Sequence, residues 1–362
     1  MWTFFVRECC GALVLALLTG VVFVLGEFLR RRGVLSPEQS RKLLHIGGCG
    51  TALLFPVLFH SHWSVLAICG GFFVLILCLS RRGQLHAVDD VERRSYGGAL
   101  HPVALYLCYL LASFYQCFAF YEIAILVLAF SDTAAALVGE RYGRFRYRVD
   151  GNNYRSIEGS FFFFLVTYAI VHHILLLVIG MAPLEASVLA FMIGAIVTLF
   201  ESVSLGGADN LAIPIGVMVI LIKNANPDLH AMIHQIVCLA AALVAVCIPM
   251  RLLRVMQGSG RVVTALLVYL ASGLHSLWWG VMTVVGAVAI HYSKTLRLAE
   301  IRTVLALAAL PFLTVMGFNL AEKLGGWFDL RDHSLRSTSA VGRTHSRQRY
   351  IYIKERPWQQ VC

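Results

Sequence analysis

The segment 131–160 places acidic, basic and glycine residues directly after an apolar run. Asp132 opens it, and a carboxylate is a ligand that Mg²⁺ prefers. Gly139 and Gly143 remove side chains where the backbone could approach a polyphosphate. Ionisable groups beside an apolar helix are costly, so a functional role is the first hypothesis for them. The segment therefore predicts a site for a metal-bound nucleotide.

Basic residues follow in the same segment. Arginine offers charge and a fork of N–H donors that suits phosphate oxygens, and the segment contains Arg141, Arg144, Arg146, Arg148 and Arg155. We expect Arg141 and Arg155 to hold the β- and γ-phosphates. Any one arginine could instead be an orientation signal beside a membrane helix. Orientation alone, however, requires neither the glycines nor the carboxylates.

Further carboxylates could share this chemistry. Glu158 precedes the next apolar run, where it could cap a helix N-terminus or join Asp132 on a metal. Glu201 ends a later apolar run, and Asp209-Asn210 follows it. Asp209 is a second candidate metal ligand. Either Glu201 or Asp209 could orient a substrate hydroxyl or take its proton.

An earlier motif, Arg41-Lys42-x-x-His45, opens another apolar run. Arg41 and His45 are four residues apart and share one helical face. Arg41 and Lys42 could steer an anionic nucleotide. His45 is a further candidate base because the unperturbed pKa of histidine lies near neutrality. A buried, hydrogen-bonded histidine is the alternative.

The composition identifies the kind of protein that carries these motifs. Of 362 residues, 59% are hydrophobic and 14% are charged, whereas soluble domains have about a quarter charged. The chain offers about ten to twelve stretches long enough to cross a bilayer as helices. The predicted fold class is therefore an all-α, polytopic transmembrane helix bundle. The net charge of +10 sits mostly in loops beside helix ends, where it meets membrane lipid rather than nucleic acid.

The loop charges predict an orientation. The basic loops 30–42, 81–96 and 139–158 should be cytoplasmic, and following the helices from there places every motif above on the cytoplasmic face. We expect a transmembrane domain over 1–225, additional helices of unknown role over 226–322, and a basic, disordered tail over 323–362. The membrane would be a bacterial inner membrane, or an endoplasmic reticulum or plastid membrane in a eukaryote.

A family resemblance accompanies these motifs. The spacing Asp132-x-x-Ala135-x-x-x-Gly139-x-x-x-Gly143, followed by Arg155-Ser156-x-Glu158-Gly159, resembles the nucleotide-binding signature of the dolichol kinase and phytol kinase family. Arg41-Lys42-x-x-His45 and Glu201 with Asp209-Asn210-x-x-x-Pro214 are similar to other segments of that family. Together they cover roughly residues 40 to 222. The family usually has lysine at the position of Arg155, and the linker before Arg155 is slightly longer here.

The resemblance implies a function and a site. Members are membrane enzymes that use CTP or another nucleoside triphosphate such as ATP, with Mg²⁺, to phosphorylate a long-chain lipid alcohol. Phytol, farnesol, dolichol, another prenol and diacylglycerol all remain open as acceptors. The implied catalytic residues are Asp132, Glu201, Asp209 and His45, and the implied metal ligands are Asp132, Glu158 and Asp209. The implied nucleotide-binding residues are Gly139, Arg141, Gly143, Arg155, Ser156, Glu158, Gly159, Arg41, Lys42 and Asn210.

Two other functions remain open. A phosphatidate cytidylyltransferase shares the Asp…Gly…Gly…Glu-Gly pattern and uses CTP, but its family adds an acidic, Ser- and Arg-rich signature and a Gly-His-Gly-Gly turn that do not follow Glu201 here. A non-enzymatic transporter would explain the apolar runs. It would not explain why the carboxylates gather on one predicted face.

Overall fold

A computed structural model of the chain describes residues 2–81, 97–150, 153–204, 207–226, 228–254, 258–274, 281–286 and 288. The chain divides into two compact units, the first ending at Ile236 and the second beginning at Val237. The domain boundaries predicted after residues 225 and 322 stay predictions. The basic tail predicted over 323–362 lies outside the described residues.

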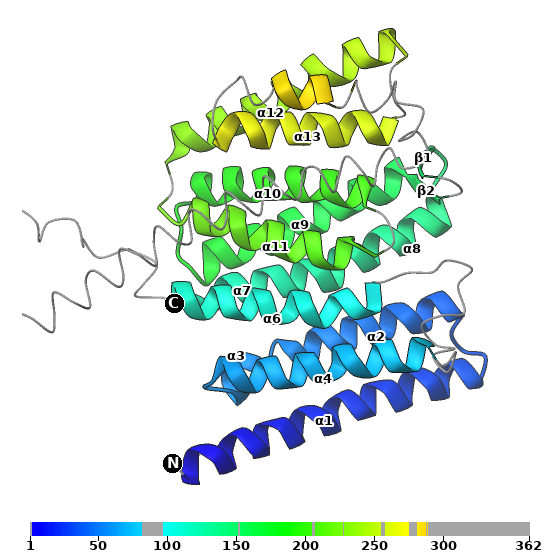
Figure 1. Ribbon diagram of the computed structural model, residues 1–362, viewed down its shortest axis with the longest axis vertical. Coiled ribbons are helices and arrows are strands. Elements are labelled where there is room, and N and C mark those ends of the chain that lie inside the picture. The colour runs from blue at the N-terminus through cyan, green and yellow to red at the C-terminus, as the bar shows by residue number, and fades with distance from the viewer. Residues whose placement is uncertain are drawn as a thin grey trace, which may run out of the picture. The chain divides into compact units, whose positions relative to one another are not determined.

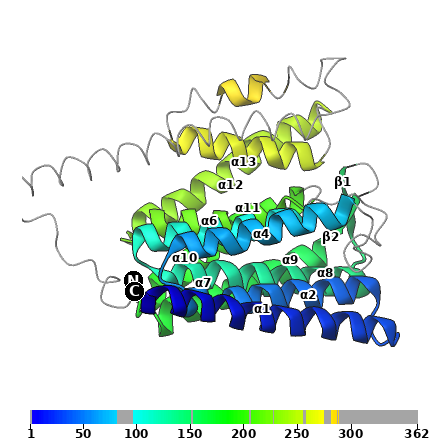
Figure 2. The same cartoon turned by 60° about the horizontal axis from the view of Figure 1, so that its bottom comes forward.

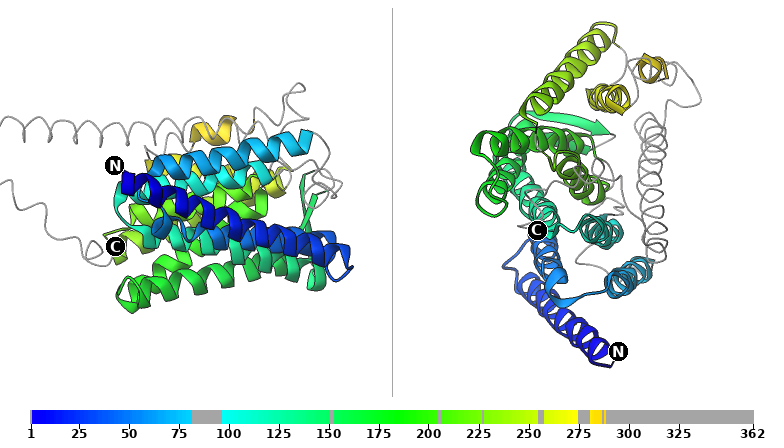
Figure 3. Two further views of the ribbon diagram at one scale, coloured as in Figure 1. Left: turned by 90° about the horizontal axis from the view of Figure 1, so that it is seen from below. Right: turned by 90° about the vertical axis from the view of Figure 1, so that its left-hand side faces the viewer.

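The first unit consists almost entirely of helices that run roughly parallel or antiparallel to one another (Figure 3). They begin with α1 (Trp2–Arg31), α2 (Pro37–Ala52), α3 (Phe55–Leu58), α4 (His62–Arg81), α6 (Gly97–Tyr115) and α7 (Phe118–Leu126). A π-helical turn, η1 (Val127–Ser131), joins α7 to α8 (Asp132–Tyr142). The later helices are α9 (Ile157–Leu177), α10 (Pro183–Val203), α11 (Asp209–Lys223) and α12 (Leu229–Leu252), and α12 continues into the second unit, which also contains α13 (Gly258–Leu274).

The prediction of a helical membrane protein is confirmed. Within the described ranges, six helical stretches are long and apolar enough to span a bilayer: 6–31, 97–115, 118–142, 157–177, 183–203 and 229–252. Two shorter apolar helices, His62–Cys78 and Gly258–Leu270, accompany them. The chain is therefore an integral, multi-pass membrane protein. The count of ten to twelve spans stays a prediction, because residues 289–362 lie outside the described part.

A β-hairpin interrupts the helices where the sequence had indicated only a loop. Strand β1 (Arg146–Asp150) pairs antiparallel with β2 (Asn153–Ser156), with Tyr147 opposite Arg155. Figures 1 and 2 show the hairpin at the end of the bundle where α8 ends and α9 begins. The loop expectation was wrong because antiparallel pairing between β1 and β2 orders this segment. The alternation of Arg146-Tyr147-Arg148-Val149 is a strand pattern of period two.

The core of the first unit lies around α7, where Tyr121 is fully buried. Its hydroxyl donates a hydrogen bond to the carbonyl of Ala52 at the end of α2, over 2.8 Å. Tyr109 of α6 donates in the same way to the carbonyl of Phe59, over 3.1 Å. In a membrane every buried polar group needs such a partner. The first bond holds α7 against the end of α2, and the second holds α6 against the end of α3. The motif on α2 therefore lies close to the turn that leads into α8.

Candidate functional site

Two buried side chains from distant parts of the sequence form the first half of the site. Lys42 of α2 places its Nζ 2.5 Å from Oδ2 of Asp132, the first residue of α8. The two side chains are only 9% and 14% exposed. Removing charges from water is costly unless they are paired. The contact therefore holds the motif Arg41-Lys42-x-x-His45 against Asp132, the carboxylate at the start of the segment 131–160.

The π-helical turn η1 directly precedes Asp132 in the chain. A π turn shifts the hydrogen bonding of a helix by one residue, and such turns are frequent at functional sites. Nε2 of His45 lies 3.2 Å from the carbonyl oxygen of Leu128 in this turn. The same nitrogen is 4.0 Å from Oδ2 of Asp132. His45 therefore lies between the turn and the carboxylate. Cys49 follows His45 by four residues in α2, and its Sγ lies 4.0 Å from Nε2 of His101 in α6.

Arg155 forms the second half of the site. Its guanidinium contacts the carboxylate of Glu201 at the end of α10, and it lies 3.1 Å from Oδ2 of Asp209 at the start of α11. The side chain of Glu201 is 4% exposed, whereas those of Arg155 and Asp209 are 24% and 18% exposed. Arg155 is also close enough to interact electrostatically with Asp132. One arginine therefore joins two carboxylates from two helices, α10 and α11.

The hairpin positions that arginine. Arg155 lies in β2, and its cross-strand partner Tyr147 lies in β1. The hydroxyl of Tyr147 is 2.8 Å from Oγ of Ser160 in the first turns of α9. Ser160 in turn donates to Glu201 over 3.5 Å. The hairpin is thus fixed to α9 and α10 by a short polar chain, with Arg155 between them.

The three glycines of the signature allow the backbone to pack around Ser156. A β-carbon at Gly139 would lie 2.8 Å from Oγ of Ser156, and one at Gly159 would lie 2.8 Å from the carbonyl oxygen of Ala135. A β-carbon at Gly143 would overlap the carbonyl oxygen of Gly139. Ser156 is the N-cap of α9, and its Oγ accepts from the amide of Gly159 at 3.0 Å. The glycines therefore bring α8 and α9 into close contact below the hairpin.

Other predicted residues make different contacts. Glu158 accepts hydrogen bonds from the amides of Arg144 and Phe145, at 3.0 and 3.1 Å, and so holds the chain that enters β1. The side-chain amide of Asn210 donates a hydrogen bond to the carbonyl of Gly97 over 2.9 Å, which holds α11 against α6. Arg141 is exposed, and its guanidinium lies 5.5 Å from the ring centre of Tyr142.

Arg41 lies at the edge of the site. It pairs with Glu38 one turn earlier in α2, at 2.6 Å. It remains close enough to interact electrostatically with Asp132 and Asp209. Thus the structure forms two clusters of contacts, one of Lys42 and His45 with Asp132 and the other of Arg155 with Glu201 and Asp209. Arg41 lies beside the first cluster. Glu158, Arg141 and Asn210 have their own partners.

Sequence reasoning missed Tyr147, Ser160 and His101. Tyr147 had a detectable signal in the strand alternation of β1. Ser160 and His101 are single residues inside apolar helices, and only packing between helices brings them to the site.

Comparison with known proteins gives the family rather than the roles of these residues. No family model and no solved structure matches the chain. A curated phytol kinase from Synechocystis sp. (strain PCC 6803) is 34% identical over 200 residues, which cover 54% of this chain and 84% of the relative. A match of that identity over most of the relative's length establishes common family membership. The chain belongs to the phytol kinase family of membrane prenol kinases.

Proposed function

We propose that this protein transfers the γ-phosphoryl group of a magnesium-bound nucleoside triphosphate to the hydroxyl of a prenol, with phytol as the first candidate acceptor. The observation that carries the proposal is the pairing of Asp132 with Lys42 and of Glu201 and Asp209 with Arg155, which brings carboxylates of three helices to basic side chains. Phosphoryl transfer requires mainly positioning and neutralisation of charge. A relative named for phytol supplies the acceptor class.

The charge balance supports a metal-bound polyphosphate. Two cations face three carboxylates, so the joined groups carry one net negative charge when all are ionised. Asp132 and Asp209 offer the hard oxygen ligands that Mg²⁺ prefers. Lys42, Arg155 and Arg41 offer donors to phosphate oxygens. Mg²⁺, when bound, would neutralise charge that develops on the β- and γ-phosphates.

The chain's own residues would then perform the following steps. Arg155 exchanges part of its contact with Asp209 for phosphate oxygens, and Lys42 does the same from Asp132. Glu201, next to Ser160, orients the acceptor hydroxyl and takes its proton. The alcohol oxygen forms a bond to the γ-phosphorus while the bond from that phosphorus to the bridging oxygen breaks. The products are a prenyl monophosphate and a nucleoside diphosphate.

The location and the donor are also part of the proposal. The site lies at the end of the bundle where α1 ends with Arg30 and Arg31, followed by Arg32. By the positive-inside rule this end faces the cytoplasm, where nucleotides are available. We propose CTP as the donor, with ATP as the alternative, on the basis of the family resemblance.

The test is an assay with two labels. Purified protein in lipid–detergent micelles is incubated with phytol, farnesol, dolichol, diacylglycerol or phosphatidate and with CTP or ATP labelled at the γ- or the α-phosphate. We expect γ-label, and no α-label, in the lipid product. Transfer of CMP to phosphatidate, seen as α-label in lipid, would establish the cytidylyltransferase alternative instead. Absence of any labelled lipid would refute both.

Matched variants connect the result to the site. Asp132→Asn should abolish transfer because the oxygen charge is lost while the shape is kept. Asp228→Asn is the control. Asp228 accepts a hydrogen bond from the backbone amide of His230 at the start of α12, and it follows the end of α11, whereas Asp209 begins that helix. Equal losses in both variants would show that the effect is not specific to the site.

A further inference from the structure

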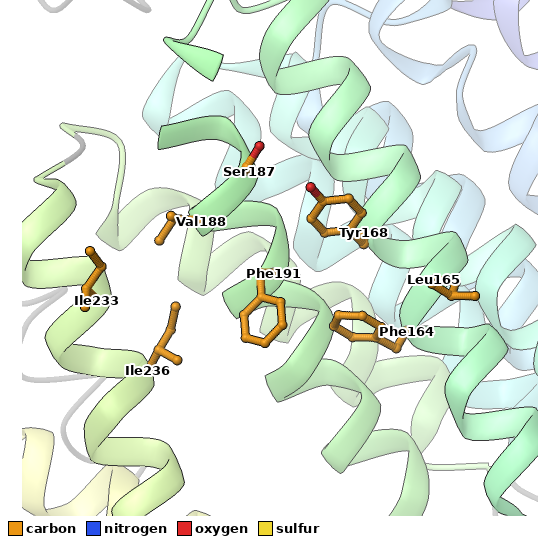
Figure 4. A pocket seen from close by; sticks show the side chains of 8 residues that line it. All are labelled: Phe164, Leu165, Tyr168, Ser187, Val188, Phe191, Ile233 and Ile236. Atoms are coloured by element: carbon orange, nitrogen blue, oxygen red, sulfur yellow. The ribbon is translucent and has the colours of Figure 1, made fainter. Parts of the chain in front are cut away.

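An apolar groove opens between α9, α10 and the first turns of α12, all within the first unit. Its volume is about 450 Å³. The groove is lined by Phe164, Leu165, Tyr168, Ser187, Val188, Phe191, Ile233 and Ile236. Figure 4 shows Phe191 between Phe164 on α9 and Ile236 on α12. Only Tyr168 and Ser187 bring polar atoms to this lining.

Aromatic rings form one wall of the groove. The rings of Phe164 and Phe191 are 5.5 Å apart and meet edge to face. Tyr168 continues the row, 6.3 Å from Phe164. Gly194 lies beside Phe164, and a β-carbon there would be 3.1 Å from the ring. The small residue therefore lets Phe164 lie flat against α10 and leaves room beside it.

The groove and the site share two helices, α9 and α10. Ser160, which hydrogen bonds to Glu201, precedes Phe164 by one turn of α9, about 6 Å along the axis. On α10, Phe191 lies about 15 Å and Ser187 about 21 Å from Glu201. The distance from the site to the far end of the groove is comparable with the extended length of a diterpenoid alcohol. At that far end Ser187 is 3.4 Å from Nδ1 of His172, so the lining becomes polar.

We propose that this groove holds the isoprenoid chain of the acceptor, with the hydroxyl at Ser160 and Glu201 and the chain end near Ser187. This inference rests on the proposed function. An apolar lining offers nothing to a charged headgroup, whereas ring faces pack against methyl-branched chains. The polar far end sets a length: a longer polyprenol must leave the groove and enter the bilayer, where it gains no further contact with the protein.

Kinetics with acceptors of different length test the groove. Phe191→Ala should raise the KM for phytol about three- to tenfold, the value expected for an aromatic contact. The KM for the shorter geraniol and for the nucleotide should stay unchanged. Phe161→Ala is the matched control, because Phe161 is on the same helix as Phe164 but 55% exposed and outside the lining. An equal rise in KM for both alcohols, or the same rise in the control, would overturn the proposal.

A photo-crosslinking measurement on the unaltered protein does not depend on the folding of a variant. A phytol analogue with a diazirine at its chain end should label peptides that contain Ser187, Val188 or Ile233. Labelling elsewhere, while the analogue is still phosphorylated, would refute the groove and leave the proposed function standing. If no prenol is phosphorylated but the analogue labels these peptides, the proposed function fails and the groove remains a prenol-binding site.

Discussion

Lys42→Met is the substitution whose consequences follow most directly from the structure. Lys42 and Asp132 contact each other at 2.5 Å with little exposure. Removing one partner of a buried ion pair leaves an uncompensated charge and costs about 3–5 kcal/mol. We expect the free energy of unfolding to fall by about 3 kcal/mol, near the lower limit because both side chains keep some contact with water. Lys42→Met/Asp132→Asn should recover most of that loss, since no charge is left buried.

The effect of Mg²⁺ on the stability of these variants extends the prediction. In the structure Lys42 occupies the carboxylate that we assign to the metal. The single variant exposes Asp132 to the cation, so Mg²⁺ at about 100 times its dissociation constant should restore about 2.7 kcal/mol. The double variant has lost the ligand and should not respond.

The assay is unfolding in detergent micelles with and without Mg²⁺, with Ca²⁺-free buffer throughout. Lys223→Met is the control because Lys223 is an exposed residue at the other end of α11 from Asp209, and it should change stability by less than about 0.5 kcal/mol. Equal protection of the single and double variants by Mg²⁺ would refute the assignment of Asp132 as a metal ligand.

Three further substitutions test the surrounding structure. Arg155→Lys keeps the charge but loses the fork of donors, so the KM for the nucleotide should rise about tenfold or more, and an unchanged KM would argue against phosphate contact. Gly159→Ala should cost about 1–3 kcal/mol by overpacking because the new methyl group meets the carbonyl of Ala135, whereas Gly70→Ala, with open space around it, should be close to neutral in the same unfolding measurement. Ser156→Ala removes the N-cap of α9 and should lower stability by about 1 kcal/mol; a smaller effect in thermal unfolding would show that the cap is not needed.

Charge and spacing in the sequence singled out several residues that contact one another in the structure, because each motif lies at the end of an apolar run. Their roles in binding and catalysis stay predictions. Glu201 and Asp209 lie near the end of α10 and at the start of α11, whereas Asp132 follows the π-helical turn inside the continuous helical stretch 118–142. Helix ends at one side of a bundle meet whenever the helices alternate in direction. The membrane-protein class was also predictable from the sequence, because long apolar runs by themselves indicate helices that span a bilayer.

The pairing of those residues was not predictable. Nothing in the sequence indicates that Lys42, rather than Arg141, reaches Asp132, because that contact depends on how α2 packs against η1. The packing role of the glycines was not predictable either: Gly139, Gly143 and Gly159 admit Ser156 and neighbouring backbone. The expectation that this segment approaches a polyphosphate stays a prediction. Glycine spacing reports close approach but does not say what approaches.

The central claim is that carboxylates and basic residues from separate helices hold one metal-bound triphosphate. Equilibrium binding of a fluorescent, non-hydrolysable CTP or ATP analogue, with and without Mg²⁺, tests it without requiring turnover or a lipid. Binding should depend on Mg²⁺ in the parent and in Asp228→Asn, and should be lost in Asp132→Asn and in Arg155→Met. Affinity that is independent of Mg²⁺, or that is equal in all four proteins, would contradict the claim.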